Sequence, residues 1–163
     1  MILAQMENLM ENLLTIRTQS AAETEACGAD LAKKMLDDPG IPPFVALYGD
    51  LGVGKTAFVR GFASVIAPGV TVRSPTFALV NEYRAKPRPL FHFDMYRITG
   101  EDDLLSIGFY DYLDRPGICL VEWSENIPYA LPDDYVRVEL RKDDPDKPDS
   151  RSLTLEQIGG AGA

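Results

Sequence analysis

Hydrophobic residues recur along the chain with periods that change between those of helices and strands. Apolar residues at helical spacing predict a helix over residues 1–14, either packed on the domain or forming an N-terminal extension. The alternation in Leu14–Thr18 is typical of a short strand. Ser20 and Glu23 form a capping-box pattern, which predicts a helix over about residues 20–36.

The middle of the chain predicts a buried strand, a helix and a hairpin. The continuous apolar run Phe44–Tyr48 is typical of a strand that is buried on both faces. A glycine-rich segment follows, and a helical pattern then continues to about Ile66. Residues 77–83 and 90–96 predict two strands, and the turn-rich stretch 86–89 between them favours an antiparallel hairpin.

The last third of the chain adds one helix, one buried strand and a terminal hairpin. Thr99 with Asp102 predicts a helix start, and the helix pattern continues to about residue 113. Residues 117–123 predict a second buried strand. Two more strands are predicted around an acidic, proline-bearing loop, over residues 135–141 and 152–155.

Length and composition suit one folded domain. The chain has 163 residues and no internal repeat or interdomain linker, so we predict a single domain over residues 1–163. The element pattern predicts an α/β fold of the P-loop NTPase type: a largely parallel central sheet with helices on both faces and antiparallel hairpin additions. A net charge of -9 argues against strong direct binding to nucleic acid, although a local basic patch stays possible.

The cysteines, the histidine and the N-terminus argue against a zinc protein, a membrane-spanning protein and a protein with a signal peptide. Cys27 and Cys119 lie far apart and His92 is the only histidine, so a zinc site is not expected. We expect both cysteines to be small buried residues in a reducing cytoplasm. No apolar run approaches the length of a membrane span, and no positive charge precedes Arg17 as a signal peptide would require.

One segment, Gly49 to Thr56, matches the phosphate-loop pattern Gly-x-x-x-x-Gly-Lys-Thr at every required position. Glycines let the backbone turn its N–H groups toward phosphate oxygens, and the following helix adds the positive end of its dipole. Lys55 would face the β- and γ-phosphates, and the Thr56 hydroxyl would face Mg²⁺. The predicted nucleotide-binding residues are contiguous: Gly49, Asp50, Leu51, Gly52, Val53, Gly54, Lys55, Thr56 and Ala57.

A phosphate loop needs a carboxylate for its metal ion, and two acidic residues end apolar strands. Glu122 follows the apolar stretch 118–121, and Asp94 ends the stretch 90–94. Because an unpaired carboxylate is costly to bury, we predict that Thr56, Glu122 and Asp94 hold Mg²⁺. Solvated carboxylates at strand ends are the alternative, and the sequence leaves open which carboxylate orients the attacking water.

Several other residues near these motifs carry weaker signals. Thr76 precedes a predicted strand, where a switch threonine of a phosphate-loop protein can reach the γ-phosphate, but a plain turn fits the spacing better. His92 and Trp123 are of types that more often belong to a core or a surface than to a catalytic site. Arg73 and Arg97 lie next to motifs and are candidates for a positive charge supplied in cis.

Several motifs, taken in their order along the chain, resemble those of the TsaE (YjeE) family, the small ATPases of bacterial tRNA threonylcarbamoyladenosine synthesis. The matching stretches are Gly49-Asp-Leu-Gly-Val-Gly-Lys-Thr56, Ser74-Pro-Thr-Phe77 with Tyr83, His92-Phe-Asp-Met-Tyr-Arg97, Ile107-Gly-Phe109 with Tyr112, and Val121-Glu-Trp-Ser-Glu125. They span about residues 20–140, and together they are far more specific than the phosphate loop alone. The resemblance covers neither the first 14 residues nor the tail after about residue 151.

The resemblance implies a substrate, a cofactor and a protein partner. ATP would be the substrate, Mg²⁺ the cofactor, and the TsaB–TsaD pair the partner on which the ATPase acts as a cycling component. The family does not itself transfer the threonylcarbamoyl group. By resemblance, six residues have roles at the nucleotide: Lys55 and Thr56 at the phosphates and metal, Thr76 in a switch-like loop, Asp94 near the nucleotide, Glu122 at the metal, and Trp123 beside the site.

Other phosphate-loop functions fit the sequence less well. A GTPase would want an Asn-Lys-x-Asp run, which is missing, and Asp114-Arg-Pro-Gly117 precedes a strand instead of following one. A small-molecule kinase would need a lid with several arginines, and the sequence has no insertion long enough to form one. We therefore predict Mg²⁺-dependent ATP hydrolysis, with a non-catalytic nucleotide-dependent switch or a small phosphate-loop kinase as alternatives. The predicted catalytic residues are Lys55, Asp94, Glu122 and Thr76.

Overall fold

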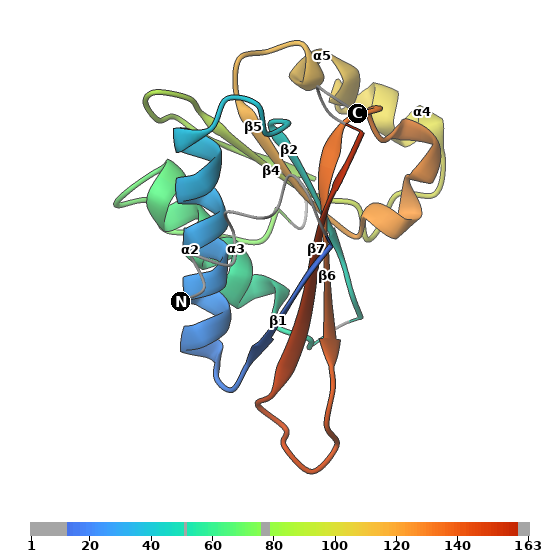
Figure 1. Cartoon of the computed structure of the whole chain (residues 1–163). Coiled ribbons are helices and arrows are strands. Elements are labelled where there is room, and N and C mark those ends of the chain that lie inside the picture. The colour runs from blue at the N-terminus through green and yellow to red at the C-terminus, as the bar shows by residue number, and fades with distance from the viewer. Residues whose placement is uncertain (1–12, 51, 76–78, 160–163) are drawn as a thin grey trace.

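The computed structural model describes residues 13–50, 52–75 and 79–159, which form a seven-stranded sheet with helices on both faces (Figure 1). The strands are β1 (Leu14–Thr18), β2 (Phe44–Tyr48), β3 (Val80–Tyr83), β4 (Leu90–Asp94), β5 (Ile118–Glu122), β6 (Tyr135–Lys142) and β7 (Arg151–Ile158). The helices are α2 (Ala21–Asp37), α3 (Lys55–Ile66), α4 (Glu101–Ser106) and α5 (Phe109–Leu113), with 3-10 turns η1 (Ser124–Asn126) and η2 (Pro128–Ala130). The helix predicted over residues 1–14 lies almost wholly outside the described residues.

The sheet has a parallel centre and antiparallel edges. Its strand order is β1-β7-β6-β2-β5-β4-β3. β2 pairs in parallel with β5 and β6, and β4 pairs in parallel with β5. β7 and β1 add antiparallel strands at one edge, and β3 adds one at the other. The predicted α/β fold class, with its parallel core and hairpin additions, is confirmed.

Alternate residues of the central strands enter two separate cores. In β2, Val45 and Leu47 pack with α2 and α3, whereas Phe44 and Ala46 face the layer that contains α4 and α5. The second core is rich in aromatic rings, and the rings of Phe93 and Phe109 meet edge to face at 5.3 Å between centroids. Burial on both faces explains why the central strands are continuous apolar runs in the sequence.

Helix α2 begins where the capping pattern predicts. Ser20 is the N-cap, and its hydroxyl accepts a hydrogen bond of 3.1 Å from the Glu23 N–H. The carboxylate of Glu23 accepts in return from the N–H of Gln19, at 3.1 Å, one residue before the usual partner. Two of the donors around the first turn are thereby satisfied by side chains.

The prediction of one helix that starts at Thr99 and Asp102 is wrong. Both the N–H and the hydroxyl of Thr99 donate to Asp103 Oδ2 at 3.0 Å, and Gly100 is the N-cap. The helix also divides into α4 and α5 at Gly108, whose φ of 71° is left-handed and cannot continue a right-handed helix.

The β3–β4 hairpin is present but shorter than predicted. β4 ends at Asp94, after which the Met95 N–H donates to the carbonyl oxygen of Glu122 at 3.0 Å. On the other strand, pairing begins at Val80 because Leu79 has a left-handed φ of 64°. Residues 76–78, which include Thr76, lie outside the described part of the chain.

Cys27 and Cys119 are free thiols, and both are buried. Burial raises the pKa of each thiol to about 12, so neither thiol ionises near neutral pH. Across residues 13–50, 52–75 and 79–159, every helix is too short or too polar to cross a membrane.

Candidate nucleotide site

The phosphate loop connects the carboxyl end of β2 to the first residue of α3. Gly49, Gly52 and Gly54 have φ angles of 141°, 77° and 100°, which other residues rarely adopt. At Gly49 the neighbouring strand also approaches closely, because an added Cβ would lie 2.7 Å from the carbonyl oxygen of Leu140. The backbone of the loop therefore requires glycine at the pattern's two glycine positions, Gly49 and Gly54.

Lys55 is the first residue of α3, and its side chain is almost completely buried. Its Nζ donates a 2.6 Å hydrogen bond to the carbonyl oxygen of Gly49 and lies 3.7 Å from the centroid of the Trp123 ring. Burial lowers the pKa of Lys55, and four neighbouring carboxylates oppose that shift. The ammonium group is thus held beside the phosphate loop, in a largely dehydrated environment that contains several carboxylates.

Trp123 is the residue that follows β5, and its backbone has a left-handed φ of 58°. This conformation is unfavourable for a large side chain, and such strain is often found at functional sites. Its ring contacts Tyr96 at 5.1 Å between centroids, as well as the ammonium group of Lys55. The strained backbone places the chain's one tryptophan against the phosphate loop.

Most of the predicted phosphate and metal residues line one pocket of about 420 Å³. Its lining consists of Gly52, Gly54, Lys55, Thr56, Ser74, Asp94, Glu122, Trp123 and Arg151. The pocket lies at the carboxyl ends of β4 and β5, which is the usual ligand position in open α/β sheets. Arg73 and Arg97 do not line it, whereas Arg151 was not predicted from the sequence.

The two predicted carboxylates are neighbours in the sheet. Asp94 ends β4 directly opposite Glu122, which ends β5. Burial raises the pKa of Asp94 and the nearby Glu122 charge raises it further, while the backbone N–H of Tyr96 donates to Asp94 Oδ1 at 3.0 Å and opposes the shift. Two adjacent acidic groups of this kind favour a nearby cation.

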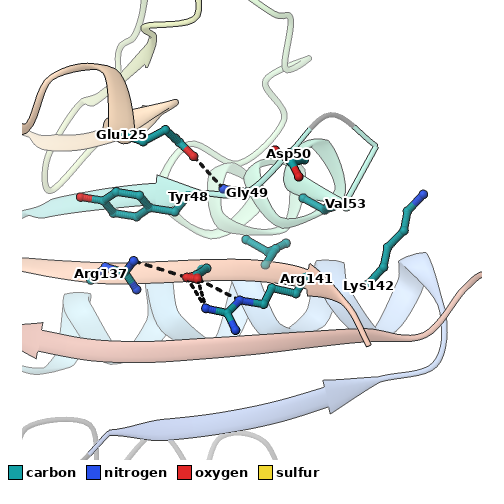
Figure 2. Close-up of a pocket in the computed structure, with 10 residues that line it drawn as sticks. Tyr48, Gly49, Asp50, Val53, Glu125, Arg137, Arg141 and Lys142 are labelled. Carbon is teal, nitrogen blue, oxygen red and sulfur yellow. Dashed lines mark hydrogen bonds and ion pairs between the residues drawn. The ribbon is translucent and has the colours of Figure 1, made fainter. Parts of the chain in front are cut away.

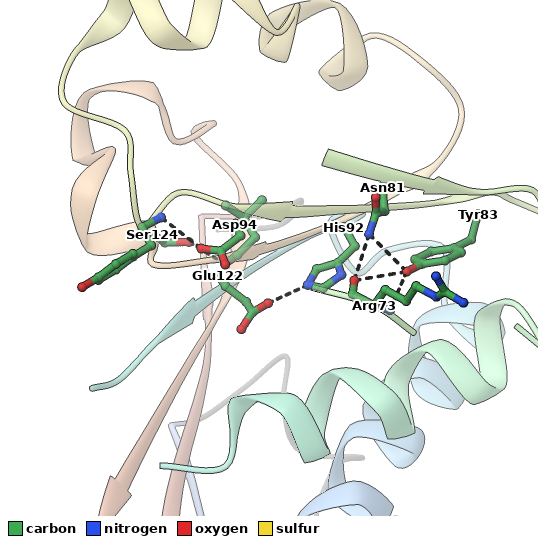
Figure 3. A network of polar contacts seen from close by, with 9 residues as sticks. Arg73, Asn81, Tyr83, His92, Asp94, Glu122 and Ser124 are labelled. Atoms are coloured by element: carbon green, nitrogen blue, oxygen red, sulfur yellow. Dashed lines mark hydrogen bonds and ion pairs between the residues drawn. The ribbon is translucent and has the colours of Figure 1, made fainter. Parts of the chain in front are cut away.

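The side chain of His92 holds the carboxylate of Glu122 in place through a hydrogen bond. Its ring is buried, and Nε2 lies 2.6 Å from Glu122 Oε2 (Figure 3). A carboxylate can only accept, so Nε2 carries the proton when Glu122 is ionised, and Nδ1 then has no hydrogen-bond partner among the described residues. The histidine is therefore a positioning residue for the predicted metal ligand, a role that its sequence position did not reveal.

The residues around the pocket fit Mg²⁺ by the chemistry of their donors. Thr56, Asp94 and Glu122 offer only oxygen atoms, which Mg²⁺ prefers. The described part of the chain has no group of three or more His, Cys, Asp or Glu side chains that could hold a metal by themselves. A Mg²⁺ ion here would need phosphate oxygens and water to complete its coordination, as is usual at nucleotide sites.

A second pocket of about 660 Å³ lies on the other side of the phosphate loop, against β6 (Figure 2). Gly49, Asp50 and Val53 line it together with Glu125. The Gly49 N–H donates to Glu125 Oε2 at 3.2 Å, a contact between residues 76 positions apart. Of the remaining predicted residues, Ala57 is buried behind the loop, and residue 51 lies outside the described part of the chain.

Comparisons with known proteins concern the family and the fold of this chain. The model of the family "Threonylcarbamoyl adenosine biosynthesis protein TsaE" matches residues 18–153. The TsaE protein of Bacillus subtilis is 36% identical over 115 residues, which are 71% of this chain and 70% of that protein. The TsaE protein of Haemophilus influenzae is 39% identical over 111 residues, or 68% of each chain. The crystal structure of Bacillus subtilis YdiB superposes with a TM-score of 0.68 at 33% identity, covering 91% of this chain and 87% of that one.

Proposed function

The chain belongs to the TsaE family of tRNA threonylcarbamoyladenosine biosynthesis proteins, and we propose that it binds ATP with Mg²⁺ and hydrolyses the γ-phosphate. The observation that supports this most directly is the 420 Å³ pocket, where the phosphate loop, Lys55, Thr56 and two strand-end carboxylates converge. Each of these groups has a separate task in phosphoryl transfer, and their convergence is what the chemistry requires.

In the proposed reaction, the loop N–H groups and Lys55 bind the phosphates. Water attacks the γ-phosphorus, the bond from that phosphorus to the bridging oxygen breaks, and ADP and inorganic phosphate leave. Lys55 neutralises the negative charge that develops on the phosphate oxygens. Asp94 or Glu122 accepts the hydrogen bond that orients the water; each has one oxygen already bonded, to the Tyr96 N–H and to His92 respectively.

Thr56, Glu122 and Asp94 are the residues that would hold Mg²⁺. When bound, the ion would supply positive charge that neutralises part of the charge of the phosphates. Asp94 is half-buried, and burial raises its pKa. A nearby cation would therefore stabilise its charged form. Arg73 and Arg97 are not among the described residues that line this pocket.

The replacement Lys55→Ala tests the proposal. We expect the variant to lose detectable ATP hydrolysis and most of its ATP affinity while it keeps its fold, because the point charge at the phosphates is removed. Lys33→Ala is the control, since Lys33 is exposed on α2 away from the pocket. Binding is measured by titration calorimetry, hydrolysis by phosphate release, and folding by circular dichroism.

The outcomes distinguish an enzyme from a sensor. Wild-type turnover in Lys55→Ala would exclude the phosphate-loop mechanism. Tight ATP binding by the natural protein with no phosphate release, alone or with its partners, would support a nucleotide-dependent switch instead. Competition between ATP and GTP in the same titration separates an ATPase from a GTPase.

We further propose that the TsaB–TsaD pair is the partner that makes this ATPase productive. Tyr96 is 53% exposed and its ring contacts that of Trp123, so an apolar surface suited to a protein contact adjoins the nucleotide pocket. A partner docked there would exclude water from the pocket and strengthen the electrostatic stabilisation.

Phosphate release with and without purified TsaB and TsaD tests the partner proposal. We expect the natural protein to be slow alone and faster with the pair. Thr76→Ala should reduce the stimulated rate more than the basal rate, if Thr76 serves as a switch residue. Equal rates with and without partners in the natural protein would leave a stand-alone ATPase.

A further inference from the structure

Arg151 is the first residue of β7, and it is fixed on both sides by strand pairing. It lies opposite Thr18 of β1 and opposite Lys142 of β6. From this position its side chain crosses to the phosphate loop, where Nε donates to the carbonyl oxygen of Val53 at 3.0 Å and Nη2 to that of Gly52 at 3.3 Å. The arginine thus contacts the two loop residues that precede Gly54.

The same guanidinium also anchors the loop that joins β6 to β7. Its Nη1 donates to the carbonyl oxygens of Pro148 and Ser150, at 2.6 and 2.8 Å. With the two bonds to the phosphate loop, four of its five N–H groups have carbonyl acceptors. No carboxylate of the described residues forms an ion pair with it.

These contacts have two consequences at the nucleotide pocket. The guanidinium holds the carbonyl oxygens of Gly52 and Val53, which restricts the rotation of these two peptide groups and so the direction of the loop N–H groups that a phosphate would meet. No carboxylate of residues 13–50, 52–75 and 79–159 pairs with the positive charge of Arg151, and the residue lines the pocket with Lys55 and Thr56. A phosphate in that pocket would therefore meet two positive side chains, one from α3 and one from β7.

We propose that Arg151 is a positioning residue of the nucleotide site, which holds the phosphate loop in its phosphate-binding shape through the carbonyl oxygens of Gly52 and Val53. The inference rests on the proposed ATP-binding function and extends it to a residue of the terminal hairpin.

The test compares Arg151→Gln and Arg151→Lys with the control Arg17→Gln. Arg17 is an exposed arginine that pairs with Asp143, on the same β6–β7 loop, at 3.7 Å and does not contact the phosphate loop. The affinities for MgADP and MgATP are measured by the fluorescence of Trp123, the one tryptophan, which lies in the pocket. Thermal unfolding without nucleotide is measured for every variant, together with KM and kcat for ATP.

We expect Arg151→Gln to weaken the binding of both nucleotides by about tenfold to a hundredfold, because charge-assisted hydrogen bonds are lost. KM for ATP should rise by the same factor with a smaller change in kcat, since the loop binds the phosphates before and during the reaction. Arg151→Lys should recover part of the affinity, because it keeps the charge but not the two-carbonyl contact. Arg17→Gln should bind both nucleotides like the natural protein.

Each contrary result has a definite meaning. Natural affinity in Arg151→Gln would overturn the inference while leaving the proposed function intact. An equal loss in Arg17→Gln would also overturn it, because the effect would then come from the hairpin loop. If Arg151→Gln does not fold, Arg151→Lys decides, and natural affinity in that variant overturns the inference. Failure of the natural protein to bind MgATP at all would instead refute the proposed function.

Discussion

Gly61 lies where α3 touches α2, and its replacement by alanine sets two effects against each other. An added Cβ would lie 1.8 Å from the carbonyl oxygen of Glu25 and 2.6 Å from its carbonyl carbon. Ordinary contact begins at 3.4 Å, so the helices would have to separate by about 1.6 Å at this point. Both atoms belong to the backbone of α2, and no side chain can rotate away to relieve the overlap.

The expected result follows from the two magnitudes. Alanine stabilises a helix interior by up to about 1 kcal/mol relative to glycine. Forcing an additional carbon into a packed interface costs about 1–3 kcal/mol and sometimes more. The two helices are also in close contact at Gly28, where an added Cβ would lie 2.1 Å from the carbonyl oxygen of Phe58. Helix α3 therefore cannot tilt away from α2 at Gly61 without disturbing this second contact. We expect the free energy of unfolding to fall by about 2 kcal/mol.

Urea denaturation monitored by circular dichroism measures this change, with Ser64→Ala as the control. Ser64 lies on the exposed face of the same helix, so its replacement introduces alanine without a new contact and removes only the 2.7 Å hydrogen bond that its hydroxyl donates to the carbonyl oxygen of Gly61. Because α3 begins with Lys55 and Thr56, we also expect Gly61→Ala to weaken ATP binding. A Gly61→Ala protein as stable as the natural one, or more stable, would refute the close helix contact.

Two further predictions concern the carboxylates and the thiols. Glu122→Gln should raise the Mg²⁺ concentration needed for hydrolysis, whereas Asp94→Asn should lower turnover with nucleotide affinity largely kept; identical Mg²⁺ titration curves would contradict this division of roles. Cys27 and Cys119 have pKa values raised to about 12 by burial, so at pH 8 a thiol reagent should label neither in the folded protein and both in urea. Rapid labelling of the folded protein would show that these residues are not buried.

Elements defined by neighbouring residues were predictable from the sequence. The run Phe44–Tyr48 gave the bounds of β2, because a strand covered on both faces contains only apolar side chains. The phosphate-loop helix begins at Lys55, since the pattern itself places the helix start there. In both cases the determining interactions lie within a few residues along the chain.

The division between α4 and α5 shows where periodicity fails. Leu104 and Phe109 both enter the second core, so the apolar pattern continues across the interruption. Gly108 takes a left-handed conformation that the pattern does not record, because glycine is also tolerated within helices. The hydrogen bonds of Thr99 to Asp103 likewise depend on side-chain geometry that spacing alone leaves undetermined.

At the candidate site, too, contacts between residues far apart in the sequence could not be predicted from local patterns. Lys55 and Thr56 belong to one contiguous motif, and the structure brings them to the same pocket as Asp94 and Glu122. Arg151 is 98 positions from Val53, and it reaches the loop only because β7 lies between β1 and β6. No local pattern records that pairing, so its contact with the phosphate loop was not predictable.

The charges around Lys55 explain why Mg²⁺ belongs to the proposed substrate. Asp94 and Glu122 lie side by side at the pocket, and burial already disfavours the charged form of Asp94. A free triphosphate would add more negative charge beside these carboxylates than Lys55 and Arg151 together offset. A divalent cation held by the carboxylates would convert this repulsion into attraction, because carboxylate and phosphate oxygens both bind such ions. The carboxylates then favour the metal complex of ATP over free ATP, which is why the Mg²⁺ titration of their variants separates their roles.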